Sequence, residues 1–168
     1  AKDAKSIFVY DIEKKIDSEL KEITSPHGDI QKFSWAQDNS KIAIIFSANK
    51  SAPASVYVWD TSNSKNSYSV NKKVPLSPIF EDVIFSSISA RDFVGITKDR
   101  IYSINIGKGK ATILDDKLNY VNKSGNYIYY YKSAKKQLIQ LEVDTQTKRV
   151  LAEGVEKGSD MTVYPAKA

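Results

Sequence analysis

The sequence contains no cysteine and a single histidine, His27. The absence of cysteine excludes a disulfide framework, a zinc–thiolate site and a cysteine nucleophile. A catalytic or metal-binding role for His27 would require partner side chains that no motif in the sequence supplies. Because Pro26 and Gly28 flank it, we expect His27 to lie in an exposed loop.

The sequence also lacks long hydrophobic runs and is poor in arginine. No apolar run approaches the ~20 residues of a membrane span, and the start, AKDAKSIFVY, lacks the apolar segment of a signal peptide. We therefore expect either a cytoplasmic protein, or a mature or excised part of a longer one. The net charge is +5, but the lysines are scattered and there are only three arginines. This pattern indicates solubilising lysines and makes nucleic-acid binding an unfavoured alternative.

The residues that are abundant favour β-structure. The chain has 168 residues, of which 41% are hydrophobic and 27% charged, as expected for one folded domain. Its apolar residues are mostly isoleucine, valine and aromatics, which fit a pleated surface. One stretch, Asp11–Ile23, has apolar residues at helical spacing. The alternative for this region is two strands joined by a polar turn, and the repeats described next favour the strands.

Two units recur along the chain. One is a strand that ends on an acidic or amide residue, followed by a polar turn and a second strand. Its polar anchors are Asp11, Asp60, Asn105 and Asp144, which lie 49, 45 and 39 residues apart. The other unit is a strand, a tight turn and a strand, at residues 30–47, 82–97 and 117–132. Together they give four antiparallel strands every ~40–50 residues, the pattern of a β-propeller blade.

The predicted fold is therefore all-β and β-propeller-like, with four-stranded antiparallel blades. The predicted parts of this single domain or propeller section are a half-blade at 6–24, blades at about 30–72, 82–115 and 117–153, and a terminal strand at 159–165. A small four-bladed ring is one arrangement, but its last blade would lack a strand. A section of a larger propeller is favoured, and a partner would then have to cover its unpaired strand edges.

One blade carries a more specific pattern. Phe33-Ser34-Trp35, then Asp38, Lys41-Ile42-Ala43 and the strand Val56–Asp60, resemble the WD40-like repeat of TolB-type β-propellers, whose blades read F-S-W-S-P-D-G-K-K-I-A-F and then I-Y-V-W-D. Ala36-Gln37 replaces Ser-Pro, and Asn39 replaces glycine, which asparagine can do at a left-handed turn position. Within this repeat we expect Trp35 and Trp59 to be interior packing residues.

The resemblance implies a fold and a cell-envelope or scaffolding setting. It suggests a non-catalytic module for protein interaction or assembly in a larger envelope or surface protein, with an extracytoplasmic location favoured and the cytoplasm kept as an alternative. Similar propellers also precede the catalytic domains of prolyl-oligopeptidase-like enzymes, so an accessory propeller of a hydrolase is the second hypothesis. The sequence has no G-x-S-x-G motif, so such a catalytic domain would lie outside this chain.

No motif indicates a catalytic residue, a cofactor site or a metal site. Residues 106–112, IGKGKAT, have the wrong spacing for a phosphate-binding loop and fit a hairpin turn. The acidic residues Glu81-Asp82, Asp115-Asp116 and Asp160 lack calcium-loop spacing, and we expect them to be solvated at strand ends.

Two segments are candidates for partner contact. In a strand, Tyr127, Tyr129 and Tyr131 share one face, and Ile128 and Tyr130 share the other. The tyrosine face either packs between blades or grips a protein or sugar. The second candidate is the sequon Asn49-Lys50-Ser51, in a long loop of small residues. The predicted partner is a protein, or the rest of a larger propeller.

Overall fold

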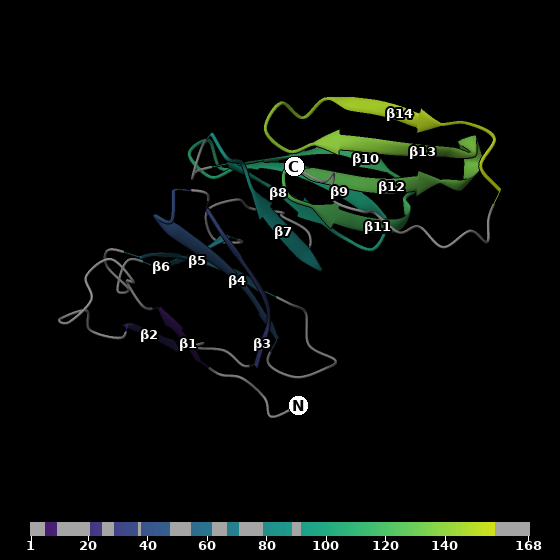
Figure 1. The fold of residues 1–168 in the computed structure, drawn as a ribbon. Coiled ribbons are helices and arrows are strands. Elements are labelled where there is room, and N and C mark those ends of the chain that lie inside the picture. Colours follow the sequence, from purple (N-terminus) through teal and green to yellow (C-terminus); the bar gives the residue numbers. More distant parts are fainter. Residues whose placement is uncertain are drawn as a thin grey trace, which may run out of the picture.

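The chain forms β-sheets almost throughout the part that the computed structural model describes (Figure 1). The described residues are 6–9, 21–24, 29–36, 38–47, 55–61, 67–70, 79–88 and 92–156, and they contain 14 β-strands and one 3-10 turn, η1 (Ser133–Lys135). The loop that carries His27 and the predicted terminal strand at 159–165 lie outside these residues.

The strands form one two-stranded sheet and three four-stranded sheets, all antiparallel. The half-blade contains β1 (Ser6–Val9) and β2 (Lys21–Thr24). The first blade contains β3 (Asp29–Trp35), β4 (Lys41–Ser47), β5 (Ser55–Asp60) and β6 (Ser67–Ser69). The second contains β7 (Asp82–Phe85), β8 (Asp92–Ile96), β9 (Arg100–Asn105) and β10 (Lys110–Asp116). The third contains β11 (Asn119–Ser124), β12 (Tyr127–Lys132), β13 (Gln137–Glu142) and β14 (Lys148–Ala152). The all-β, propeller-like fold with four-stranded blades is thus confirmed.

Each four-stranded sheet follows chain order, so every strand pairs with the next through a hairpin. The turns carry the residues that this geometry needs. Asn39 has a φ of 55° between β3 and β4, and Gly125 has a φ of 54° between β11 and β12. The Asp38 carboxylate accepts the Ser40 N–H at 2.9 Å and braces the first of these turns.

The hydrophobic cores lie between sheets, not within them (Figure 1). The core between the first and second blades joins Ala43, Ile45 and Val58 to Phe80 and Phe93, among others. The core between the second and third blades includes Val94, Ile96, Tyr130 and Leu141. A third core, Ile42, Ile44, Phe46 and Trp59, lies on the opposite face of the first blade, where Ile7 of the half-blade packs against it. Each sheet therefore depends on its neighbours for burial.

Packing between the first two blades leaves no room for a side chain at Gly95 in β8. A Cβ atom there would lie 2.3 Å from Phe80 Cε1, far inside van der Waals contact. The Phe80 ring is fully buried and meets Phe93 and Tyr102 edge-on, at centroid distances of 6.4 and 6.0 Å. Glycine in this strand allows the aromatic ring to lie directly against the backbone.

The two tryptophans differ in burial, and the prediction for one of them is wrong. Trp59 is buried, with 4% of its surface exposed, whereas Trp35 is 39% exposed. Both lie on the same face of the first blade, since both pair with Ile42 across adjacent strands. Trp59 lies on the central strand β5, but Trp35 lies at the end of the edge strand β3, with a neighbouring strand on one side only.

Candidate functional site

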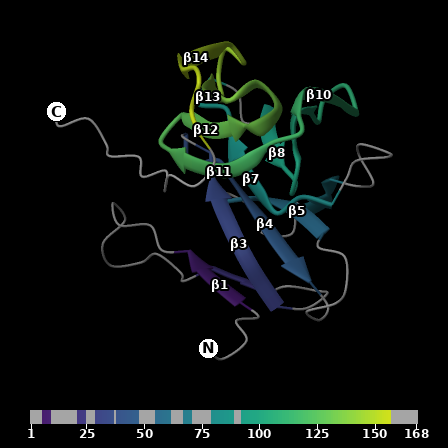
Figure 2. The same cartoon turned by 90° about the vertical axis from the view of Figure 1, so that its right-hand side faces the viewer.

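The edge strands β3, β7 and β11 of the three blades come together on one side of the molecule (Figure 2). Their ends surround a hollow of about 640 Å³, which we call the central hollow. The residues that line it are Ser34, Trp35, Ile84, Phe85, Ser87, Lys123, Gly125 and Asn126. All three blades contribute to it, so its shape depends on how the blades pack.

The central hollow combines an apolar wall with a polar rim. Of the apolar residues in its lining, Ile84 and Phe85 are 9% and 5% exposed, and Trp35 is 39% exposed. The polar side chains in its lining belong to Ser34, Ser87, Asn126 and Lys123. Apolar surface with a few polar groups fixed around it is the usual composition of a ligand or peptide site.

A shared carboxylate ties the three edge strands together beside this hollow. Asp82 in β7 accepts from Lys32 of β3 at 3.3 Å and from Lys123 of β11 at 2.9 Å. The Asp82 side chain is 13% exposed, while the two lysine side chains are 52% and 43% exposed. Two ammonium groups face one carboxylate, so the cluster keeps a local charge of +1 and favours an acidic partner group.

Asp144 fixes the rim between the second and third blades. Its carboxylate accepts the Ser86 hydroxyl and the Asn126 amide, both at 2.9 Å, and also the hydroxyl and backbone N–H of Ser87. These bonds hold Ser87 and Asn126 where they line the central hollow. The sequence identified Asp144 as a repeat anchor but gave no sign of this link between blades. Asn105, another anchor, donates to Asp92 within the second blade at 2.6 Å.

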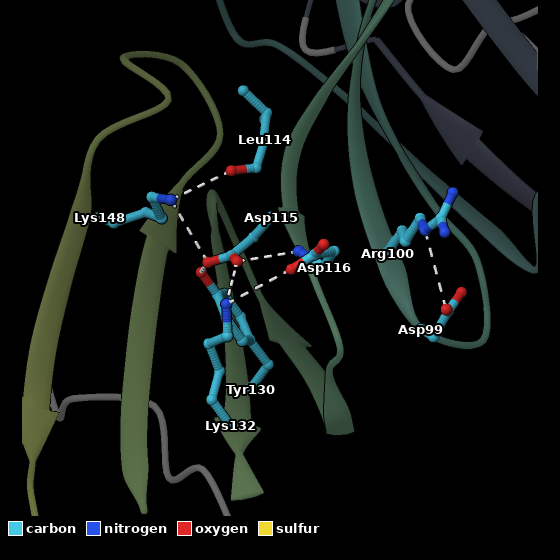
Figure 3. Close-up of polar contacts among 8 residues, drawn as sticks. All are labelled: Asp99, Arg100, Leu114, Asp115, Asp116, Tyr130, Lys132 and Lys148. Atoms are coloured by element: carbon cyan, nitrogen blue, oxygen red, sulfur yellow. Dashed lines mark hydrogen bonds and ion pairs between the residues drawn. The ribbon is translucent and has the colours of Figure 1, made fainter. Parts of the chain in front are cut away.

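A buried charge cluster lies elsewhere between the second and third blades (Figure 3). Asp115 is 8% exposed and accepts from the Tyr130 hydroxyl at 2.6 Å and from the Lys132 ammonium, and the Lys148 Nζ lies 3.4 Å away. Burial opposes ionisation of this carboxyl, but the hydrogen bonds from Lys132, Tyr130 and the Asp116 N–H, with the Lys148 charge, lower its pKa to about 2.

The expectation that Asp115 is solvated is therefore wrong. Burial, with the bond to the Asp115 carboxylate, also raises the pKa of Tyr130 well above its ordinary value. Both groups hold one protonation state at neutral pH, Asp115 ionised and Tyr130 protonated. Such a pair stabilises the contact between blades and is poorly suited to acid–base catalysis, which needs a pKa near the working pH.

The predicted tyrosine face has the geometry that alternation suggests. Ile128 and Tyr130 are fully buried against the second blade, and the other three tyrosines lie on the opposite face of β12. On that face Tyr131 is 6% exposed and donates to the Val155 carbonyl at 2.6 Å, so the chain itself covers it. Tyr127 is 37% exposed, and the half-buried Tyr129 accepts the Gln140 amide at 3.0 Å.

The structure brings the tyrosine face together but does not join it to the central hollow, whose lining contains none of these tyrosines. Partner contact at Tyr127, Tyr129 and Tyr131 remains a prediction. The other predicted contact residues, Asn49, Lys50 and Ser51, lie outside the described residues. The central hollow itself was not predicted, although Ser34 and Trp35 belong to the motif that the sequence singled out.

Comparison with known proteins finds likeness in structure only. No family model matches the chain, and no curated protein does. The solved structure of TolB from Acinetobacter baumannii is similar with a TM-score of 0.56 and 13% identity, over 91% of this chain and 39% of TolB. The fold is propeller-like. The chain spans about two fifths of the length of TolB. A nidogen/laminin complex gives a TM-score of 0.46 and 8% identity, over 86% of this chain and 74% of that chain.

Among the described residues, no three His, Cys, Asp or Glu side chains lie close enough to hold a metal ion. None of the helical segments described is long and apolar enough to cross a membrane. Within the described residues, the central hollow joins apolar and polar residues of all three blades.

Proposed function

We propose that this chain is a protein-interaction module that holds a polypeptide segment of its partner in the central hollow. The observation that carries this proposal is the convergence of three blades on one hollow with an accessible tryptophan. Exposed Trp35 beside buried Ile84 and Phe85 gives an apolar anchor point. Aromatic anchors seated in such pockets contribute most of the binding energy in protein interfaces.

The polar groups around the anchor suit a peptide better than an apolar small molecule. Serine hydroxyls and the Asn126 amide can bond to a peptide backbone, and the Lys32–Asp82–Lys123 cluster adds a local positive charge. The partner segment is therefore proposed to carry an apolar side chain next to an acidic one.

The wider setting is also a proposal. The resemblance of the first blade to TolB-type repeats supports an envelope or surface protein with an extracytoplasmic location, and a scaffolding role within it. The match to only 39% of the length of TolB supports a section of a larger propeller. The fixed protonation states of Asp115 and Tyr130 support a structural role for this pair at the contact between the second and third blades.

A peptide library tests the central hollow. Random peptides displayed on phage are selected against the whole chain, and the dissociation constants of the enriched peptides are measured by titration calorimetry. We expect Trp35→Ser and Lys123→Ala to weaken binding by about tenfold or more, the loss of roughly 1.4 kcal/mol. The control Ile113→Ser removes a 51% exposed side chain of β10 that is not part of the lining of the hollow, so the dissociation constants should not change. Enriched peptides that bind both variants as well as the wild type would overturn the proposal.

A further inference from the structure

Each blade carries a polar pair at the place where its second strand begins and its third strand ends. The pairs are Lys41–Asp60, Asp92–Asn105 and Asn126–Asp144. Each of them links two neighbouring strands, or the turns at their ends, within one blade. Asp144 does more than this position in the repeat requires, because it also bonds to Ser86 and Ser87 of the second blade. These additional bonds point to a further role for the Asp144 carboxylate.

The hydrogen bonds to Asp144 use the whole accepting capacity of its carboxylate. Oδ1 accepts the Ser86 hydroxyl and the Ser87 N–H, and Oδ2 accepts the Ser87 hydroxyl and the Asn126 amide. A carboxylate has about four lone-pair sites, so none is left for a bound molecule. Asp144 can therefore act on the central hollow only through its neighbours. Of these, Ser87 and Asn126 line the hollow, whereas Ser86 is only 6% exposed.

These bonds decide what Ser87 offers to the central hollow. A serine hydroxyl has one hydrogen to donate and two lone pairs that accept. Ser87 gives its hydrogen to Asp144, so its oxygen can only accept from any other group. Among the described residues, no group donates to this oxygen. The rim of the hollow at Ser87 is therefore a fixed hydrogen-bond acceptor.

The charge nearby limits which donor this acceptor can take from a bound segment. Lys123 lies in the same hairpin as Asn126 and lines the hollow, and with Lys32 and Asp82 it forms the cluster of local charge +1. A positive rim disfavours a lysine or arginine side chain as the donor. A backbone N–H carries no net charge and is present at every residue of a segment except proline. It is therefore the donor that suits Ser87.

We propose that Asp144 is a positioning residue that holds Ser87 as an acceptor for one backbone N–H of the bound segment. The N–H donates to the Ser87 oxygen, and the Ser87 hydroxyl donates to Asp144. Consecutive hydrogen bonds polarise one another, so the carboxylate makes the Ser87 oxygen a stronger acceptor. This inference rests on the proposed binding of a segment in the central hollow, and it names one contact that fixes where the segment's backbone lies.

The test combines protein variants with changes in the peptide backbone. Asp144→Asn keeps the shape of the side chain but adds an N–H that can donate to Ser87, which frees the Ser87 hydrogen and turns Ser87 into a donor. Ser87→Ala removes the acceptor itself. The probe is the tightest-binding peptide of the phage selection, resynthesised as a series in which each backbone N–H in turn is replaced by an ester oxygen. Titration calorimetry gives the dissociation constant of every pair.

We expect one ester position to weaken binding to the wild type by about tenfold, the effect of losing one hydrogen bond. The same ester should weaken binding to Asp144→Asn and to Ser87→Ala by less than about twofold, because neither variant offers the acceptor. Asp92→Asn is the matched control. It removes the acid of the equivalent pair in the second blade, outside the lining of the hollow, and should keep the full effect of the ester.

Ester effects that are equal in the wild type, Asp144→Asn and Ser87→Ala at every position overturn the inference. This holds even if Asp144→Asn weakens all peptides, since Asp144 would then support only the packing of the blades. If Asp144→Asn does not fold, the comparison of Ser87→Ala with the wild type decides. Binding that depends on Trp35 and Lys123 but on no ester position overturns this inference alone. A selection that enriches no peptide, or only peptides indifferent to Trp35→Ser and Lys123→Ala, overturns the proposed function as well.

Discussion

Strands β3 and β7 occupy the same position in neighbouring blades but differ sharply in exposure. β7 reads DVIF, a continuous apolar run, and its three apolar residues are at most 9% exposed. β3 reads DIQKFSW, in which apolar and polar residues alternate over most of its length, and two of its aromatics are among the most exposed in the described chain.

The difference teaches how the two patterns should be interpreted. A strand that is buried on both faces needs apolar residues at successive positions, whereas alternation marks a strand with one covered face. β7 lies between two complete blades, and both of its faces belong to cores. In β3, Phe33 and Trp35 share one face of the first blade, and their burial depends on what packs against that face.

Phe80→Ala should lower the free energy of unfolding more than any other change proposed for this chain. It tests the core that covers one face of β7. Phe80 is fully buried between the first two blades, so its removal leaves a cavity. We expect the free energy of unfolding to fall by about 3–5 kcal/mol, measured by urea denaturation. A loss below about 1 kcal/mol would mean that this core is much looser than its burial indicates.

Gly95→Ala should act on the same contact from the opposite side. The added Cβ would meet the Phe80 ring at 2.3 Å, so we expect a loss of about 3 kcal/mol, near the upper end for overpacking. Phe80→Leu replaces the ring by a smaller side chain. Combining the two changes should lower the free energy of unfolding by less than the sum of the two single losses. Strict additivity in urea denaturation would show that the two residues do not interact.

The pH dependence of stability tests the other covered face of the second blade, where Asp115 lies against the third blade. Its pKa is lowered in the folded protein from its usual 3.8 to about 2, so its contribution is complete above pH 4 and is lost as the pH falls towards 2. The shift corresponds to about 2 kcal/mol of stability. We expect Asp115→Asn to be less stable at neutral pH and to show a flatter stability profile between pH 5 and 2. Profiles of equal slope would contradict this role.

Phe33→Ser should have the smallest effect on stability and would sharpen the contrast with Phe80. Its side chain is 52% exposed, so the isolated chain should lose less than about 0.5 kcal/mol. The measurement is the same urea denaturation, with Ile113→Ser as the control of equal exposure. A loss similar to that of Phe80→Ala would show that Phe33 is covered within the free chain.

The features that depend on local sequence were predictable. Each hairpin consists of two alternating strands and a turn residue, such as Asn39 or Gly125, that lie within a few positions of one another in the sequence. This local pattern predicted the four-stranded blades. The faces of β12 followed from alternation in the same way. Local patterns of this kind carry the fold because each hairpin is decided by its own residues.

The features that depend on contacts between blades were not predictable. Asp115 looked like a solvated residue at a strand end, but a bulge between Ile113 and Asp115 shifts the register of β10. The bulge places Asp115 opposite Ile101, on the face that packs against the third blade. Trp35 was misjudged for a related reason: its motif shows that it belongs to a strand, but its burial depends on the neighbouring sheet. The central hollow depends on three blades at once.

The location of the cores between sheets determines how the chain can be divided. The second blade gives Val83 and Phe93 to one core and Val94 and Ile101 to another, so alone it would complete neither. The smallest piece that encloses a whole core is a pair of adjacent blades. Stability should therefore build up as a series of nearest-neighbour terms, one for each pair of sheets, as in linear repeat proteins. A cut between two blades would remove one such term, whereas a cut within the second blade, which contributes to two cores, would remove two.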